Sequence, residues 1–332
     1  MSLSPVNLDS FNHQSTKLTT GRTYHYVDQL PANYDANKTI TLLLIHGFPD
    51  LWAAWKNQIG PWVEAGYRVV APDMLGYGQT DKPDEPEEYS FKKLSDDLAA
   101  LLNHIGSPKA VLIGHDWGSF IASRFVLWHP QRVLGVAHLS VAFFPPNNEY
   151  VPLEEIARRI PDYAYQLFFA DPATTKKIED HVEFFYRSLF AVSGTSGGSI
   201  SDLARVLNGE IKVDPSVIKT ILSDEELKFY TTQNDSFRGP LNYYRTTKIR
   251  FDEEKADNLP PTYTVKIPVL FLRGTADSTS PEASIGLIKK FLPQTKVINY
   301  EGAGHWLMHQ EKENVAKDVL SWLSESKLSS KL

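Results

Sequence analysis

Short apolar runs alternate along the chain with segments of helical periodicity, and this alternation limits the fold more than any other feature. The runs are TITLLLIHG, YRVVAPD, KAVLIGHD, VLGVAHLS, IPVLFLRG and TKVINY. Each is apolar at mostly consecutive positions, which is typical of strands buried on both faces of a parallel sheet. Between two of them, SFKKLSDDLAALLNHIG spaces its apolar residues three or four apart, which predicts a helix ended by Gly106. We therefore predict an α/β fold with a mostly parallel central sheet flanked by helices.

A long segment with helical patterns interrupts this alternation. The break begins at Phe144-Pro145-Pro146, and the alternation resumes near Ile267-Pro268. Between these points lie PLEEIARRI, KKIEDHVEFFYRSLF, a Gly/Ser-rich loop and many aromatic residues. We predict that this segment is an inserted helical lid, or cap domain. The predicted division is residues 1–144 for the first part of the core, 145–251 for the lid and 252–332 for the second part of the core.

Composition excludes several functional classes. The chain has 332 residues, of which 42% are hydrophobic and 22% charged, as in ordinary globular proteins. A net charge of -6 without a run of Lys and Arg argues against a surface for nucleic acid or anionic membrane. The absence of cysteine rules out disulfides, thiolate catalysis and Cys-ligated zinc. No apolar stretch approaches the ~18 residues of a membrane span, and the first residues have no signal-peptide pattern.

The segment GHDWGS follows one of the apolar runs and precedes a helical pattern. This is the form of the G-x-S-x-G nucleophile elbow, a strained turn between strand and helix that exposes one reactive side chain. Asp116 occupies the position of the serine. Considered alone, Asp116 is as well explained as the N-cap of the following helix.

Three other loops favour a catalytic Asp116. HGFP follows the first run, and the backbone N–H groups of Phe48 and Trp117 would together form an oxyanion hole. Asp277 and His305 each follow a later run, and each by itself is an ordinary loop residue. Nucleophile, acid and histidine in this order, each after its own strand, are typical of the α/β-hydrolase fold. We therefore predict a catalytic triad.

A metal site is an alternative to this triad. His305 and His309 are four residues apart, a spacing that can place two ligands on one helical face. However, Trp306 occupies the position of the glutamate in H-E-x-x-H, and Gly304 precedes the pair in a loop. We predict no metal and no cofactor.

The chain resembles the soluble epoxide hydrolases of the α/β-hydrolase fold from about Lys17 onward. The likeness lies in HGFPDLWAAW, RVVAPDMLGYGQTDKP, GHDWGS and GAGHW. In the lid, GPLNYYR and YQLFF are similar to the family segments that hold two epoxide-activating tyrosines, which implies that role for Tyr244 and Tyr165. Tyr163 and Tyr243 are the nearest alternatives. Some relatives have an N-terminal phosphatase domain that this chain lacks, so we expect a single activity.

The resemblance implies a reaction in two steps. The carboxylate of Asp116, ionised without a base because its reference pKa is ~3.9, opens the epoxide to an alkyl ester. Tyr165 and Tyr244 hydrogen-bond the ring oxygen and protonate it as the ring opens. His305, oriented by Asp277, then activates a water that hydrolyses the ester to a vicinal diol.

The aromatic residues of the lid, together with Phe48, Trp52 and Trp117, predict an apolar pocket. Such a pocket suits a lipophilic epoxide, either a lipid epoxide or an aromatic compound that requires detoxification.

Two alternatives to an epoxide hydrolase remain. A haloalkane dehalogenase uses the same Asp nucleophile with side-chain N–H groups for the halide; Trp117 fits that pattern and Phe48 does not. A fluoroacetate-type enzyme would need arginines near the nucleophile, and HDWGS offers none. A non-catalytic ligand-binding protein on this fold would typically have lost a triad member, and none is missing.

The chain ends with Ser330, Lys331 and Leu332, the S-K-L tripeptide that the peroxisomal import receptor reads. The same tripeptide at 326–328 shows that this composition also generates it by chance. We expect a peroxisomal localisation, with the cytoplasm as a second compartment.

Overall fold

The computed structural model describes residues 3–192 and 200–328. Its centre is one eight-stranded sheet with the strand order β1-β2-β4-β3-β5-β6-β7-β8. The strands from β3 to β8 are parallel to one another, as the apolar runs predict, and β1 and β2 are antiparallel at one edge. The strands are β1 (His13–Lys17), β2 (Thr23–Gln29), β3 (Thr41–Ile45), β4 (Arg68–Pro72), β5 (Ala110–His115), β6 (Val133–Leu139), β7 (Val269–Gly274) and β8 (Lys296–Tyr300).

The two antiparallel strands were not among the predicted runs. Their sequences, HQSTK and TYHYVDQ, are too polar to form a continuous apolar run. Strand β1 is at the edge of the sheet and mostly exposed, so it needs few apolar residues. Strand β2 lies between β1 and β4 and is mostly buried, but its buried positions include the polar residues His25 and Gln29.

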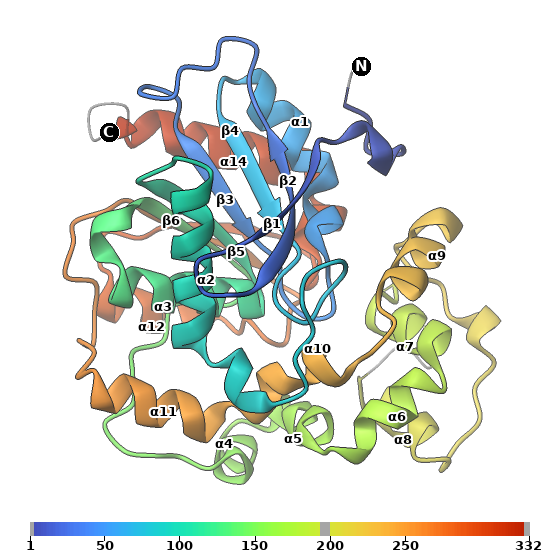
Figure 1. Ribbon diagram of the computed structural model, residues 1–332. Helices are drawn as coiled ribbons and strands as arrows, with labels where there is room; N and C mark the ends of the chain where they lie inside the picture. The colour runs from blue at the N-terminus through green and yellow to red at the C-terminus, as the bar shows by residue number, and fades with distance from the viewer. Residues whose placement is uncertain (1–2, 193–199, 329–332) are drawn as a thin grey trace.

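Helices cover both faces of the sheet, as Figure 1 shows. The alternating side chains of β3 explain why: Leu42 and Leu44 belong to one core cluster, and Leu43 and Ile45 to the other. The helices of this core are α1 (Lys56–Glu64) and α14 (Lys312–Glu325) in the first cluster, α2 (Phe91–His104), α3 (Trp117–Trp128) and α12 (Ala283–Phe291) in the second, and the short α13 (Leu307–Gln310).

Helix α2 forms where its periodicity predicts. The hydroxyl of Ser90 caps it by accepting a hydrogen bond from the backbone N–H of Lys93. After the helix ends, Gly106 has a φ of 67°, which glycine adopts without steric cost.

Helices between β6 and β7 form a separate layer beside the core (Figure 1). They are α4 (Leu153–Arg159), α5 (Tyr165–Ala170), α6 (Ala173–Glu179), α7 (Val182–Leu189), α8 (Ile200–Leu207), α9 (Asp224–Gln233), α10 (Arg238–Asn242) and α11 (Thr247–Ala256). The expected boundary between residues 251 and 252 falls inside α11. That helix is joined to α3 by a buried ion pair in which Arg124 Nε lies 2.6 Å from Glu254 Oε1.

The parallel strands direct their carboxyl ends to one edge, where the loops after β3, β5, β7 and β8 meet. These loops contain Phe48, Asp116, Asp277 and His305, respectively. The topology therefore brings together four residues that are distant in the sequence.

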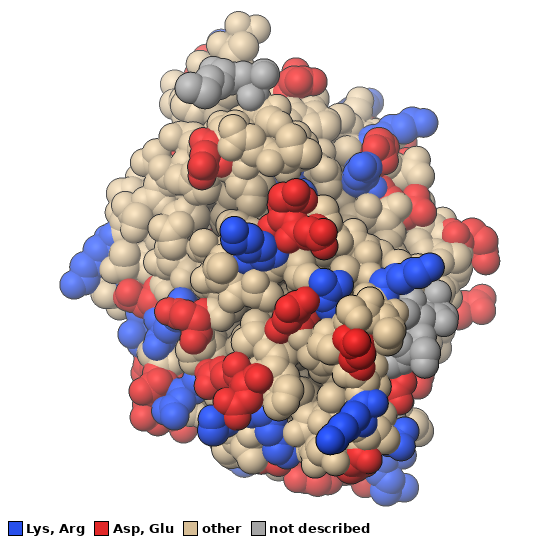
Figure 2. Space-filling model, turned by 90° about the vertical axis from the view of Figure 1, so that its right-hand side faces the viewer, with Lys and Arg blue, Asp and Glu red and all other residues tan. Residues whose placement is uncertain are grey.

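Charged side chains of both signs are interspersed over the face shown in Figure 2. In the part of the chain that the structure describes, every helix is too short or too polar to cross a bilayer. Ser330, Lys331 and Leu332 lie outside the described residues.

Candidate active site

Asp116 sits at the apex of a strained turn between β5 and α3. Its φ of 53° and ψ of -123° are unusual for a residue other than glycine. A Cβ at Gly114 would collide with the backbone of α3, and a Cβ at Gly118 with the backbone at the end of β3. The two glycines therefore allow the strand and helix to approach closely, which the elbow requires.

The carboxylate of Asp116 does not cap the helix that follows it. Its side chain makes no capping hydrogen bond to α3, every residue of which the structure describes. Instead, Oδ1 accepts a hydrogen bond of 2.9 Å from the backbone N–H of Phe48. The backbone N–H of Trp117, at the start of α3, also interacts with this carboxylate and lowers its pKa. Both expected oxyanion-hole groups thus hold the carboxyl group of the candidate nucleophile.

His305 lies between two carboxylates. Its Nδ1 is 3.0 Å from Asp277 Oδ2, and its Nε2 is 3.6 Å from Asp116 Oδ2. The backbone carbonyl of His305 accepts hydrogen bonds of 2.9 Å from His115 Nε2 and from the Ser140 hydroxyl. His305 is therefore held both through its imidazole ring and through its backbone carbonyl.

Thr279 was not predicted from the sequence, yet it orients the acid of this triad. Its backbone N–H and hydroxyl donate to Asp277 Oδ1 over 2.9 and 2.7 Å. These bonds leave Oδ2 of Asp277 to face the histidine. A threonine two residues after the acid is a weak signal, because such turns are common where no catalysis occurs.

The three triad groups shift one another's pKa values. Burial lowers the pKa of His305, but the carboxylates of Asp277 and Asp116 outweigh it and raise the pKa to about 9. Burial raises the pKa of Asp277, but the charge and hydrogen bond of His305 lower it to about 2. Burial also raises the pKa of Asp116. The charge of His305 and the backbone N–H groups of Trp117 and Phe48 lower this pKa, but they do not cancel the effect of burial. The unreacted site thus favours an imidazolium between two carboxylates.

Two tyrosines of the lid face this triad. The rings of Tyr165 and Tyr244 are 6.3 Å apart between centroids, and Tyr244 also contacts the rings of Phe48 and Trp117 at 5.1 Å each. Burial raises the pKa of both phenols, and the charge of Asp116 raises it further. Both hydroxyls are therefore protonated at neutral pH and can donate hydrogen bonds near the nucleophile.

The alternative tyrosines have other contacts. The hydroxyl of Tyr243 donates 2.9 Å to the backbone carbonyl of Leu75, and its ring packs on Tyr77 and Tyr89. The hydroxyl of Tyr163 donates to the backbone carbonyl of Thr279 over 3.3 Å. Both hydroxyls are thus engaged by backbone oxygens, which favours Tyr165 and Tyr244 as the pair that meets substrate.

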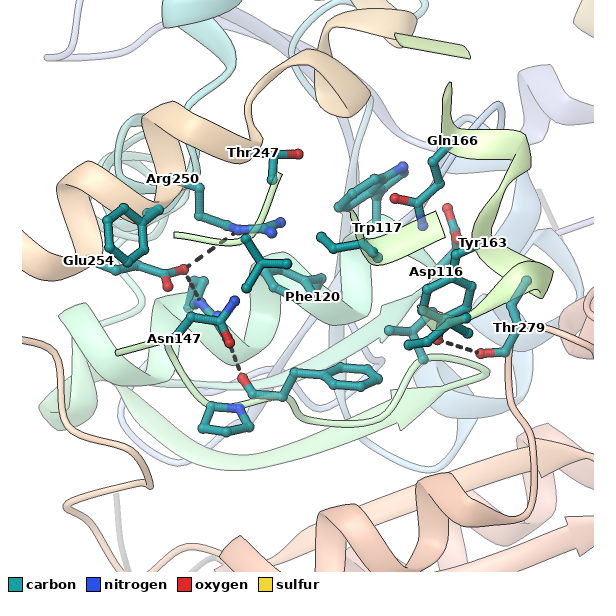
Figure 3. Close-up of a pocket in the computed structure, with 18 of the residues that line it drawn as sticks. Asp116, Trp117, Phe120, Asn147, Tyr163, Gln166, Thr247, Arg250, Glu254 and Thr279 are labelled. Carbon is teal, nitrogen blue, oxygen red and sulfur yellow. Dashed lines mark hydrogen bonds and ion pairs between the residues drawn. The ribbon is translucent and has the colours of Figure 1, made fainter. Parts of the chain in front are cut away.

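Two cavities meet at the nucleophile. One has a volume of about 240 Å³ and the other about 190 Å³, and Asp116, Tyr165 and Thr279 line both. Figure 3 shows the larger cavity, with Trp117 and Phe120 between Asp116 and the helix α11. A substrate atom at Asp116 therefore has space on two sides.

Trp52 does not belong to this site, contrary to the expectation from sequence. Its ring packs on Phe11 and His13 at centroid distances of 5.1 and 5.0 Å, in the core cluster of α1 and α14. Among the residues that the structure describes, it lines neither of the two cavities. The residue follows the HGFP loop closely, but a short 3₁₀ turn at Trp52–Trp55 directs it into the core.

Arginines line the larger cavity, which sequence reasoning missed. Arg124 comes from α3 and Arg250 from α11, and Glu254 lies beside them. The HDWGS motif itself contains no arginine, and α11 is distant from that motif in the chain. Nothing in the local sequence of α11 indicates that it faces the cavity.

Among the described residues, no cluster of three or more His, Asp and Glu side chains has the arrangement of a metal site. His309 lies in α13, and His305 lies in the preceding loop.

Comparison with known proteins supports this architecture. A family model described as alpha/beta hydrolase fold matches residues 40–312. An epoxide hydrolase of Neurospora crassa is 30% identical over 97% of this chain and 98% of its own length. The chain belongs to the epoxide hydrolase family of the α/β-hydrolase fold. A solved relative within this family, epoxide hydrolase A of Mycobacterium thermoresistibile, is 28% identical, with a TM-score of 0.77 over 95% of this chain and 98% of that one.

The bifunctional epoxide hydrolase 2 of Rattus norvegicus is 32% identical over 96% of this chain. The chain spans 56% of the length of that protein.

Proposed function

We propose that this protein hydrolyses a lipophilic epoxide to a vicinal diol through a covalent ester on Asp116. The observation that carries the proposal is the placement of a carboxylate nucleophile between His305 and the two lid tyrosines, Tyr165 and Tyr244. Family membership and the names of the similar enzymes support the same reaction. The apolar side chains that line the larger cavity, such as Phe120, Val141 and Ile156, suit a lipophilic substrate.

In the first step, the carboxylate attacks one carbon of the epoxide. Because Oδ1 of Asp116 is held by the Phe48 N–H, Oδ2 is the oxygen available to attack. A C–O ester bond forms, and the C–O bond of the ring breaks. Tyr165 or Tyr244 donates its proton to the ring oxygen, which stays on the neighbouring carbon as a hydroxyl group, and the tyrosine regains a proton from water.

In the second step, water hydrolyses the ester. His305 Nε2 takes a proton from a water that attacks the carboxyl carbon of Asp116, and Asp277 stabilises the imidazolium that forms. The N–H groups of Phe48 and Trp117 stabilise the oxyanion, and removal of one such donor typically costs ~10² to 10³ in rate. The imidazolium of His305 then gives its proton to the departing alkoxide, so the diol leaves with one oxygen from Asp116, and the oxygen of the water stays in the carboxylate.

The dehalogenase alternative fits the site less well. A dehalogenase needs side-chain N–H groups that are free to bind a halide, and the indole of Trp117 instead packs edge-on against the ring of Tyr244, at 5.1 Å between centroids. Phe48 contributes only its backbone N–H, which is bound to Asp116.

Intact-protein mass spectrometry tests the proposal directly. The His305→Gln variant should retain the nucleophile but lack the base, so exposure to styrene oxide should add the mass of one epoxide at Asp116. The matched control, Asp116→Ala with His305→Gln, should gain no mass. An adduct with a haloalkane, which releases halide, in place of one with the epoxide would instead establish the dehalogenase.

An isotope experiment separates ester formation from direct attack by water. Excess wild-type enzyme in ¹⁸O-labelled water, limited to one turnover, should release unlabelled diol because the new oxygen comes from Asp116. Diol labelled in its first turnover would contradict the covalent mechanism.

A further inference from the structure

The larger cavity has a charged end beyond its apolar middle. Figure 3 shows Asp116 on one side and Arg250 with Glu254 on the other, separated by Phe120 and Trp117. Thr247, Arg250, Phe251 and Glu254 of α11 line this end at a spacing that places them on one helix face. A buried charged group in an otherwise apolar cavity costs free energy unless an opposite charge or a hydrogen bond compensates it.

Two guanidinium groups share one carboxylate there. Arg124 Nε lies 2.6 Å from Glu254 Oε1, and Arg124 Nη1 donates to the backbone carbonyl of Phe144 over 2.6 Å. These two side chains are only 2% and 4% exposed and neutralise each other. Arg250 is 3.9 Å from the same Glu254 oxygen, which Arg124 already binds more closely. The end of the cavity therefore carries an excess of one positive charge.

Arg250 is the group that lacks a close partner. Its side chain is 14% exposed, and among the described residues it donates no hydrogen bond to any acceptor. Its guanidinium lies over the rings of Phe120 and Phe91, at 4.7 and 5.5 Å from their centroids. Burial, together with the charge of Arg124, lowers the pKa of Arg250 to about 10 against the opposing effect of Glu254. Arg250 is therefore still a cation at neutral pH, held by aromatic faces with its donors unused.

We propose that Arg250, supported by Arg124, binds a carboxylate on the substrate, so that the enzyme acts on epoxides that carry an acid group. This inference rests on the proposed function, because the epoxide must reach Asp116 while the acid reaches Arg250. One excess positive charge matches one carboxylate, and the planar fork of arginine suits its two oxygens. The hydroxyl of Thr247, one turn earlier on α11, lines the same end of the cavity.

The second cavity fixes where the epoxide lies in such a molecule. Among the described residues, Asp116 lines this cavity and Arg250 does not, and the lining combines apolar groups such as Phe169, Leu189 and Ala191 with the polar groups of the triad. Because both cavities open on Asp116, the acid arm of the substrate occupies one and an alkyl tail the other. The epoxide is therefore in the middle of the chain of the substrate.

The test compares the mid-chain epoxide of oleic acid with its methyl ester, which differs only in the charge at the acid end. For wild-type enzyme, kcat/KM for the acid should exceed that for the ester by ~10- to 100-fold, as expected for charge-assisted hydrogen bonds in a buried site. In Arg250→Met, this ratio should fall to near one. In Arg250→Lys, which retains the charge but not the fork, it should be intermediate.

Lys248→Met is the matched control, because it removes one positive charge from the same helix at a position 57% exposed to solvent. Its acid-to-ester ratio should equal that of wild type. Equal kcat/KM for acid and ester in the wild-type enzyme, which needs no variant to fold, would overturn the inference. So would an acid-to-ester ratio that Arg250→Met leaves unchanged.

Styrene oxide distinguishes this inference from the proposed function. It carries no acid group and is too short to reach from Asp116 to Arg250. Turnover of styrene oxide without a preference for the acid would refute the carboxylate site alone. Failure to hydrolyse styrene oxide, the oleic acid epoxide and its ester would refute the epoxide hydrolase itself.

Discussion

The negative charge of Asp116 controls the state of His305. Before reaction, both Asp116 and Asp277 favour the imidazolium, and the pKa of His305 is about 9. Esterification converts Asp116 into a neutral group, so one of the two stabilising charges disappears. The pKa of His305 then falls towards the working pH at the step in which a neutral base is needed. Formation of the ester on Asp116 therefore favours the neutral form of His305, which hydrolysis of that ester requires.

This coupling predicts a particular pH dependence. In single-turnover experiments, hydrolysis of the ester should accelerate as the pH rises, with an apparent pKa below 9, because the protonated histidine cannot accept a proton. Ester formation should be lost on the acid side instead, as the pH falls through the raised pKa of Asp116. Stopped-flow measurement of both steps between pH 5 and pH 9 checks this.

The same coupling can be measured without turnover. An NMR titration should give His305 a pKa below 9 in Asp116→Asn, because the charge that raises it is gone. The exposed control Asp9→Asn should leave the value unchanged. An unaltered His305 pKa in Asp116→Asn would show that Asp116 has no influence on the base.

Neighbouring tyrosines offer a second test at the scale of the residue. Tyr244→Phe should slow ester formation by ~10² or more, because a proton donor to the ring oxygen is lost, while hydrolysis of the preformed ester stays the same. Tyr243→Phe removes the neighbouring hydroxyl, whose hydrogen bond to the Leu75 carbonyl is structural. It should instead destabilise the protein by ~1–3 kcal/mol through the buried carbonyl left unpaired. Rapid-quench kinetics and urea unfolding separate the two outcomes.

At the scale of the element, the turn between β5 and α3 depends on close backbone contact. Its main constraint is steric, because a side chain at Gly118 would enter the backbone at the end of β3. The contact also places Asp116 within 2.9 Å of the Phe48 N–H, which lies in the loop after β3. The same close backbone contact therefore sets both the packing of α3 and the geometry of the oxyanion hole.

Gly118→Ala should accordingly destabilise the protein by ~1–3 kcal/mol or more, because the added methyl group has no space, and should also reduce activity. Gly286→Ala is the matched control. Gly286 lies in α12 with no atom within 4 Å of the added Cβ, so the same change should stabilise the helix by up to ~1 kcal/mol. Urea unfolding measures both. Equal effects at the two positions would refute the steric argument.

At the scale of the whole molecule, the lid is attached to the core beside the catalytic loops. The indole N–H of Trp306 donates 2.8 Å to the carbonyl of Leu189, and its ring stacks on Phe190 at 4.0 Å. Tyr230 of α9 donates 2.6 Å to Oδ1 of Asp50, which lies in the loop of the oxyanion hole. The lid thus contacts the loops that position His305 and Phe48.

The contact between Tyr230 and Asp50 predicts a stability effect that depends on pH. Burial raises the pKa of Asp50 to about 7, although the Tyr230 hydroxyl and His305 lower it. Tyr230→Phe should cost ~1–3 kcal/mol in the free energy of unfolding. The loss should be larger at pH 8 than at pH 5, because the ionised carboxylate loses its donor while the protonated acid is neutral.

Urea unfolding at the two pH values measures this loss. Tyr67→Phe, whose hydroxyl has no partner among the described residues, should change stability by less than ~0.5 kcal/mol. A loss in Tyr230→Phe that is larger at pH 5 would contradict the assigned ionisation of Asp50.

The sequence by itself determined the parallel strands, the elbow and the order of the triad residues. These features are local: a strand buried on both faces must be apolar at consecutive positions, and the elbow needs small residues beside its nucleophile. The short spacing between β7 and Asp277, and between β8 and His305, also fixes which strand end each residue follows. Strands β1 and β2 escaped prediction because β1 is an exposed edge strand and the buried positions of β2 include polar side chains, so neither has a continuous apolar run.

Only the tertiary structure decided which side chains share the cavity. Trp52 and Phe48 are close in sequence, yet a single short turn places Trp52 in the opposite core cluster. Arg124 and Arg250 are distant in sequence, yet α3 and α11 bring them to one carboxylate. The local pattern of apolar and polar residues indicates whether a side chain is buried, because burial follows from the polarity of that side chain. The pattern does not indicate which residues the side chain contacts, because those contacts depend on how helices distant in the sequence pack together.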